Sequence, residues 1–253
     1  MGNLATYACT ALAGSNKAGI LKPDADGYYT VVLGAMDVYN SAGSFYPWES
    51  AREVFKESSS LMRRIANGAC RAEYGHPKRL PGMSIRDFIE RILQIHEENV
   101  CAHIRKVWVT YDQIKDKNGR PVIAVLGEVK PCGPRGDALK ASLDNPSENV
   151  CFSVRSLTDD VRIGGVIHKN IRTIVTWDYV NEPGISVANK FMAPGLEGMD
   201  EVAITAASLG SIRDYQSTSG ISMESSGGVT AAEAIEALGF EQPVVRTPAS
   251  ARW

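Results

Sequence analysis

A serine in the middle of the chain lies where a nucleophile could be presented. Ser153 stands between Phe152 and Val154 in a strand-like apolar run, within the stretch from Gly127 to Leu157. A serine hydroxyl attacks a carbonyl carbon efficiently only when a neighbouring base takes its proton and a third group orients that base. A packed core serine would look the same, so the interpretation of Ser153 as a nucleophile depends on partners from elsewhere in the chain.

Of the four histidines, His76 is the best candidate for the base. It lies in a Gly-His-Pro turn, and such a turn presents the ring at a fixed angle, as a general base requires. An exposed loop histidine fits the local sequence equally well. His96 and His103 lie at a predicted helix end and in a predicted strand, where a lone histidine is usually solvent-facing or satisfied in the core. His168 is expected at an exposed hairpin turn.

Two carboxylates compete for the third position. Asp178 is a lone carboxylate in the apolar run TIVTWDYV, and Glu128 ends another apolar run. Burying a carboxylate costs free energy unless it has a partner, so each of them needs one. Either could orient the histidine, or could instead pair with a cation such as Arg155 or Lys130, and the local sequence leaves both options open.

The sequence offers little for a metal ion or a nucleotide. Cys101, His103 and His96 supply suitable ligand atoms, but their spacing matches no common zinc pattern. Neither a Walker-type nor a Rossmann-type glycine pattern is present. We therefore expect no metal and no cofactor.

The elements that must position these residues indicate a single β-rich α+β domain over residues 1–190. Alternating and continuous apolar runs predict most of it as strand, and spacing of three and four residues predicts helices. Beyond the run that holds Ser153, strands are expected at 28–33, 100–111, 121–130, 163–168 and 171–180, with turns at 116–119 and 169–170. Helices are expected at 51–66 and at 85–93, the second one capped by Ser84.

The character of the chain changes near its end. Residues 191–253 are rich in Ala, Gly, Ser and Glu, have few aromatic residues, and contain one predicted helix near 231–238. Few of these positions could bury a sizeable core. We expect a flexible, separable C-terminal tail after a domain that ends near residue 190.

Composition narrows the class of protein. The chain has 253 residues, 44% of them hydrophobic and 22% charged, which is ordinary for a globular protein. The net charge of −2 carries no polyanion-binding signature, so nucleic acid is not an expected partner. No run approaches the length of a membrane span. Five cysteines without a CxxC pair indicate reduced thiols rather than a disulfide framework.

Four motifs together resemble the prohead core proteases of large tailed bacteriophages, which are distant relatives of the herpesvirus assemblins. In order they are EYGHP, GEVKPCGPRGDAL, the strand from Phe152 to Arg155, and TWDYVNEPG. The resemblance spans about residues 20–190. It implies a small β-barrel surrounded by helices and peptide-bond hydrolysis through an acyl-enzyme. It also implies His76 as base, Ser153 as nucleophile and Asp178 as orienting group, and so favours Asp178 over Glu128.

The same resemblance implies further properties. Backbone N–H groups would hold the oxyanion, with help from Arg155 or from the loop at 184–187, and cleavage would follow a small residue, any residue, then Glu. Independently of the resemblance, Ser156 is a second candidate nucleophile to consider. It lies three positions after Ser153, so strand alternation should turn it to the opposite face. The implied substrates are scaffold or core proteins and capsid proteins inside the assembling prohead, in the host cytoplasm.

The tail contains several small-x-Glu triplets, so we expect it to be removed by self-cleavage. Because the herpesvirus relatives are activated by dimerisation, a homodimer is a further expectation. The alternative function is a catalytically inactive capsid-assembly protein that keeps the fold and binds the scaffold.

Overall fold

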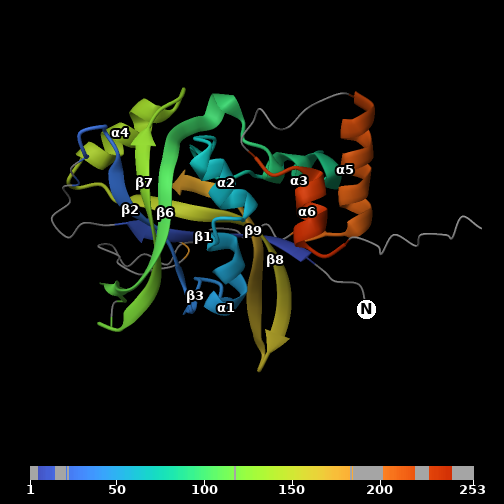
Figure 1. Ribbon diagram of the computed structural model, residues 1–253, viewed down its shortest axis with the longest axis horizontal. Helices are drawn as coiled ribbons and strands as arrows, with labels where there is room; N and C mark the ends of the chain where they lie inside the picture. The colour runs from blue at the N-terminus through green and yellow to red at the C-terminus, as the bar shows by residue number, and fades with distance from the viewer. Residues whose placement is uncertain are drawn as a thin grey trace, which may run out of the picture.

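Two β-sheets built on two long hairpins form the framework of the fold (Figure 1). The computed structural model describes residues 5–14, 21, 23–116, 118–182, 184, 202–219 and 228–240. One hairpin joins β6 (Val100–Lys115) to β7 (Pro121–Pro131), and the other joins β8 (Val150–Ile163) to β9 (Val166–Val180). The shorter strands are β1 (Ala5–Gly14), β2 (Tyr29–Met36), β3 (Val38–Tyr39), β4 (Phe45–Tyr46), β5 (Arg71–Glu73) and β10 (Val202–Ile204).

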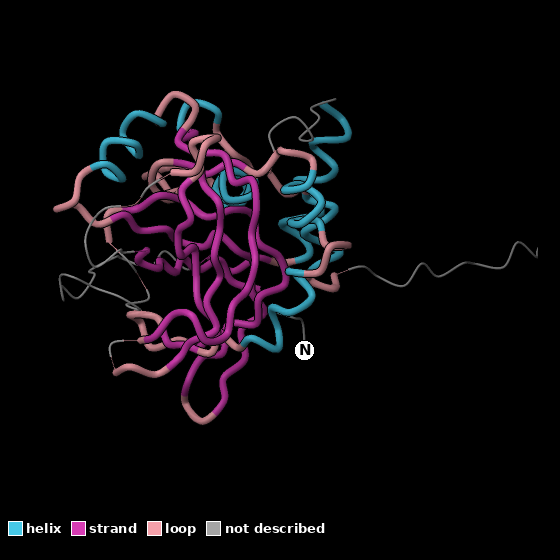
Figure 2. Tube along the Cα trace, turned by 60° about the vertical axis from the view of Figure 1, so that its left-hand side comes forward, coloured by secondary structure: helices cyan, strands magenta, loops and turns pink. Residues whose placement is uncertain are grey.

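The two sheets curl around a shared core. One sheet has the strand order β10-β1-β8-β9-β4-β3, and the other has the order β2-β7-β6-β5. A parallel bridge between Tyr74 and Tyr179 joins the end of β5 to β9. Buried side chains of both sheets, such as Val129 and Trp177, belong to one apolar cluster. The predicted β-rich α+β fold is confirmed, with the strands forming a curled half-barrel and the helices lying around it (Figure 2).

The helices lie around this half-barrel, and some of them add buried side chains such as Ala51, Leu61 and Leu139 to its core. They are α1 (Trp48–Ala51), α2 (Ser60–Ala66), α3 (Ile85–Leu93), α4 (Gly136–Asp144), α5 (Ala206–Ser219) and α6 (Ala231–Ala237), with 3-10 turns η1 (Arg52–Phe55) and η2 (Glu97–Asn99). Figure 1 shows α3, α5 and α6 together on one side. Their buried side chains, including Phe88 and Ile212, form a second apolar cluster with Leu157 of β8 and Val175 of β9. Within the described ranges, no helix combines the length and apolar character that a bilayer span needs.

The helix predicted over residues 51–66 is wrong in its middle. The chain forms α1 and η1, becomes extended at Lys56, and starts α2 only at Ser60. Ser59 causes the restart because its hydroxyl accepts a hydrogen bond from the Met62 N–H at 3.1 Å, which caps the new helix. The helix predicted over 85–93 is confirmed, with Ser84 as its cap.

The turn predicted at residues 169–170 is also wrong. The chain turns at Gly164 and Gly165, whose φ angles of 57° and 87° lie in the left-handed region that favours glycine. As a result β9 runs without interruption from Val166 to Val180 along β8. His168 therefore lies within a strand, opposite Val161, and not at an exposed turn.

Part of the predicted C-terminal tail is folded onto the domain. β10 pairs with β1, and residues such as Leu209, Ile212, Val229 and Ala234 are fully buried against α3. For residues 202–219 and 228–240 this corrects the expectation of a separable segment. Small residues are poor predictors of a core, yet they allow helices to approach closely and so bury the few large side chains between them. Residues 185–201, 220–227 and 241–253 lie outside the described part of the chain.

Candidate active site

The turn after β5 and the C-terminal end of β9 bring His76 to Asp178. The Gly75 N–H donates to the Tyr179 carbonyl at 2.7 Å, and Gly75 has a φ of 81°, so the chain turns sharply just before His76. His76 Nδ1 then lies 2.9 Å from Asp178 Oδ2. The side chain of His76 is 9% exposed and that of Asp178 is fully buried. The predicted base and orienting group are thus in hydrogen-bond contact.

Strand register brings Ser153 to the same place. In the β8–β9 hairpin Ser153 is directly opposite Asp178, and facing residues of an antiparallel pair have their Cβ atoms about 5 Å apart. The Ser153 hydroxyl is fully buried and has no hydrogen-bond partner among the described residues. Leaving a buried hydroxyl unpaired costs about 1–3 kcal/mol. The Ser156 hydroxyl is likewise buried without a described partner, so the position opposite Asp178, and not burial, distinguishes Ser153.

Ser156 does not share this location. A bulge after Arg155 changes the register, so that Ser156 lies opposite Ile174. Phe152 and Val154, which alternate with Ser153 along the strand, point into the half-barrel core. Ser156 has the same parity as these two residues, and therefore points to the opposite face from Ser153.

Arg155 lies on the carboxylate side of the site. Its Nε donates to Asp178 Oδ2 at 2.9 Å and its Nη2 donates to Asp178 Oδ1 at 2.6 Å, while its Nη1 donates to the Gln94 carbonyl at 2.8 Å. The guanidinium is fully buried. The expectation that Arg155 supports an oxyanion is therefore revised, because its donors are engaged by Asp178 and by the end of α3. Of the loop at 184–187, the structure describes only Gly184.

This arrangement keeps Asp178 ionised. Burial raises the pKa of the Asp178 carboxyl, but attraction by Arg155 and the hydrogen bond from His76 outweigh it, and the pKa lies below its ordinary value. An ionised Asp178 accepts the Nδ1–H of His76, which leaves Nε2 as the basic nitrogen.

A second buried carboxylate, Glu73, was not singled out from the sequence. Both of its oxygens contact the guanidinium of Arg91, and its Oε1 accepts the His96 backbone N–H at 2.7 Å and lies 3.4 Å from Arg155. The carboxylates of Asp178 and Glu73 thus lie together with the guanidiniums of Arg155 and Arg91. Charges can be buried in a low-dielectric interior when they are paired in this way. The available signal was the position of Glu73, three residues before His76, although the strand RAE that carries it is not apolar.

The other candidates have different partners. Glu128 lies on β7 and accepts from Arg105 Nε at 2.8 Å, in a cluster that includes Asp24. His103 contacts the Tyr28 hydroxyl at 2.9 Å and the Gly68 carbonyl at 3.0 Å. Asp178 is thus the carboxylate that contacts the histidine, whereas Glu128 pairs with Arg105 on the other sheet.

The neighbouring loop from Pro131 to Gly136, which we expect to line a substrate cleft, packs on the start of β6. The Cys132 N–H donates to the Cys101 carbonyl at 3.0 Å, and the Arg135 N–H donates to the Val100 carbonyl at 2.9 Å. Burial, and then the negative charge of Asp178, raise the pKa of the Cys101 thiol. The loop is therefore held against the N-terminal end of β6. Its role in binding substrate stays a prediction.

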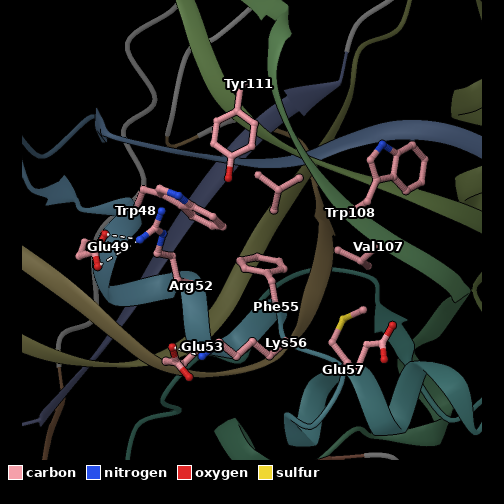
Figure 3. A pocket seen from close by; sticks show the side chains of 12 residues that line it. Trp48, Glu49, Arg52, Glu53, Phe55, Lys56, Glu57, Val107, Trp108 and Tyr111 are labelled. Carbon is pink, nitrogen blue, oxygen red and sulfur yellow. Dashed lines mark hydrogen bonds and ion pairs between the residues drawn. The ribbon is translucent and has the colours of Figure 1, made fainter.

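A surface groove lies elsewhere on the molecule. It has a volume of about 570 Å³ and lies between α1, η1 and β6, with Trp48, Phe55 and Tyr111 among its lining residues (Figure 3). None of the three predicted catalytic side chains lines it. Across the described ranges, no group of three or more His, Cys, Asp and Glu side chains is arranged to hold a metal ion.

Comparison with known proteins identifies the family. Residues 7–235 match the Peptidase S80 family. The chain is 45% identical over 194 residues to the capsid maturation protease of Pseudomonas phage phiKZ, and the alignment covers 75% of this chain and 70% of that protein. It is also similar to the solved structure of the bacteriophage T4 capsid assembly protease, gp21, with 14% identity and a TM-score of 0.49 over 69% of this chain and 97% of that one.

The family match includes the strands that carry Ser153 and Asp178, and it continues past residue 190 into α6. The predicted resemblance to phage prohead proteases is confirmed. The chain belongs to the peptidase S80 family.

Proposed function

We propose that this protein is a serine endopeptidase that cleaves scaffold or core proteins and capsid-protein propeptides during maturation of a phage prohead. The main support from the structure is the 2.9 Å contact between His76 Nδ1 and Asp178 Oδ2. Asp178 in turn lies directly opposite Ser153 in the β8–β9 hairpin. Membership of a peptidase family, and 45% identity to a protein named for capsid maturation, support the same assignment.

The residues divide the reaction among them. The Asp178 carboxylate accepts the Nδ1–H of His76 and orients the ring. His76 Nε2 takes the proton of Ser153 as Oγ attacks the scissile carbonyl carbon, and the resulting imidazolium returns that proton to the leaving amine when the C–N bond breaks. Water, deprotonated by the same nitrogen, then hydrolyses the acyl-enzyme and restores the serine. Backbone N–H groups would hold the oxyanion.

Access to the nucleophile requires movement. Ser153 and Asp178 are fully buried and His76 is nearly so. A peptide therefore reaches the hydroxyl only after a covering segment moves, as in enzymes that assemble their site when substrate enters.

The proposed setting is the interior of a prohead in the host cytoplasm, with the enzyme acting as a homodimer. The proposed cleavage motif is a small residue, any residue, then Glu.

The tail carries several triplets of this kind, but those ending at Glu233 and Glu236 lie in α6, where the backbone is helical and the Glu233 side chain caps the helix. Self-cleavage would therefore use triplets outside α6, such as those that end at Glu197 or Glu224.

A peptide assay tests the assignment. Wild type should cleave a peptide after small-x-Glu, and a serine-directed phosphonate should block cleavage and form an adduct on Ser153. Ser153→Ala and His76→Ala should each lose activity by at least about 10⁴-fold. Ser156→Ala and Glu128→Gln are the matched controls and should retain activity.

Activity that survives Ser153→Ala, or an adduct on another serine, would refute the assignment. A wild type that never cleaves across a concentration series, yet binds scaffold protein, would favour the inactive assembly factor instead.

A further inference from the structure

We propose that Gly228 is a positioning residue for catalysis, because it seats the end of α3 that holds Arg155 against Asp178. This inference rests on the proposed function, since it assigns the C-terminal segment 228–240 a role in the same site. The chain of contacts runs from Gly228 through the backbone of Leu93 and Gln94 to the buried ion pair.

The first contact leaves no room for a side chain. The Val229 N–H donates to the Leu93 carbonyl at 2.9 Å, which lays the segment directly on the end of α3. A Cβ atom added to Gly228 would lie inside van der Waals contact of the Leu93 carbonyl oxygen and 3.2 Å from Gln94 Cα. Both neighbours are backbone atoms, so a larger residue must displace the chain and cannot be accommodated by a rotamer change.

The second contact joins the same backbone to the catalytic carboxylate. The Gln94 carbonyl accepts from Arg155 Nη1 at 2.8 Å, and the Ile92 carbonyl lies 3.5 Å from the same atom. These carbonyls belong to the C-terminal end of α3, where partial negative charge favours a cation. Arg155 is therefore held at one end by α3 and at the other end by Asp178.

The apolar surroundings make this connection stiff. Val229, Ala231 and Ala234 are fully buried in one cluster with Ile92 and Leu93 of α3. Such a contact transmits a displacement because close-packed interiors have little free volume to absorb it. A shift of about 1 Å at Leu93 and Gln94 is expected to move Arg155, and misplacement on that scale costs up to about 10²-fold in rate.

The charged groups around the carboxylate determine a second readout. Arg155 and His76 contact Asp178 directly, Glu73 with its partner Arg91 lies beyond Arg155, and Cys101 of β6 is a further titratable neighbour among the described residues. If Arg155 moves away, less positive charge faces Asp178, and protonation of His76 becomes easier. The acid limb of the pH profile of kcat/KM should then move to higher pH.

Gly228→Ala, compared with Gly210→Ala, tests the inference in the full-length chain. Gly210 lies in α5 of the same C-terminal region, and an added Cβ there would meet no atom within 4 Å outside its own turn of helix. We expect Gly228→Ala to lower kcat by about 10- to 100-fold and to move the acid limb to higher pH, while Gly210→Ala behaves like wild type. The titration of the His76 ring, followed by NMR, should move in the same direction and does not depend on turnover.

A double mutant separates this effect from general destabilisation. If Gly228 acts through Arg155, then Gly228→Ala should have no further effect on kcat in an Arg155→Gln background. Should Gly228→Ala fail to fold, Thr230→Val removes the α6 capping box without adding atoms at Leu93. This loosens the segment on α3, and it should move the same limb with a smaller loss of kcat.

Three results would overturn the inference: wild-type kcat and pH profile in Gly228→Ala, equal losses in both glycine variants, or additive losses in the double mutant. A wild type that cleaves no peptide would instead refute the proposed function, and the His76 titration would still decide whether the contact from Gly228 reaches the site.

Discussion

The buried pair of Asp178 and Arg155 allows the structural and catalytic roles of the carboxylate to be separated. Asp178→Asn leaves the Arg155 guanidinium fully buried without its bidentate partner. Removing one member of a buried pair costs about 3–5 kcal/mol. We expect a loss of about 3 kcal/mol in the free energy of unfolding, the lower end of that range, because the Glu73 carboxylate remains 3.4 Å from Arg155.

Adding Arg155→Met should reverse most of this loss. The double variant removes one negative and one positive charge and leaves the Glu73–Arg91 ion pair intact. It therefore no longer leaves the Arg155 guanidinium buried without its partner, which is the main cost of breaking a buried pair. The double variant should thus approach the stability of wild type.

Activity should not follow stability. Without the carboxylate, the His76 ring loses the acceptor that holds its Nδ1–H, and a Ser-His-Asp site with Asn in the third position loses about 10⁴-fold in kcat. Urea unfolding, followed by tryptophan fluorescence to which buried Trp177 beside Asp178 contributes, gives the stabilities, and peptide cleavage gives the rates. The reasoning fails if activity returns together with stability, or if Asp178→Asn is as stable as wild type.

Two further predictions concern acid stability and the tail. Because the pKa of Asp178 is lowered in the folded protein, the unfolded state takes up the proton first on acidification, and the free energy of unfolding should fall as the pH drops below about 4. Urea titrations should show a shallower acid limb for the Asp178→Asn/Arg155→Met variant, and parallel limbs would contradict this. For the tail, intact-mass measurement after prolonged incubation should show loss of a C-terminal piece in wild type but not in Ser153→Ala, and two full-length masses would count against self-cleavage.

Several features of the candidate site followed from local sequence. Ser153 in an apolar run, His76 in a Gly-His-Pro turn and Asp178 alone in an apolar strand are visible because alternation and turn chemistry are properties of neighbouring residues. The long β6–β7 hairpin and the Ser84 cap of α3 were predicted for the same reason.

Local sequence did not separate Asp178 from Glu128. Both are carboxylates at the end or middle of apolar strands, and their difference lies in which strand pairs with which. The β8–β9 register sets Asp178 opposite Ser153, whereas Glu128 lies on β7 and meets Arg105. A shift of one residue in register would turn every side chain of the strand to the other face, so this choice belongs to the tertiary structure.

The C-terminal helices also depend on tertiary contacts that the local sequence did not predict. Their Ala- and Gly-rich sequence indicated a tail with little to bury, because composition counts the size of side chains and not the closeness of their packing. In the structure, Gly228 lies on the backbone of α3, and Val229 and Ala234 are fully buried. The sequence by itself determined the types of the reacting groups and the strands and turns that carry them. Only the tertiary structure decided which groups meet, because contacts between distant segments depend on register and close packing, which no local pattern encodes.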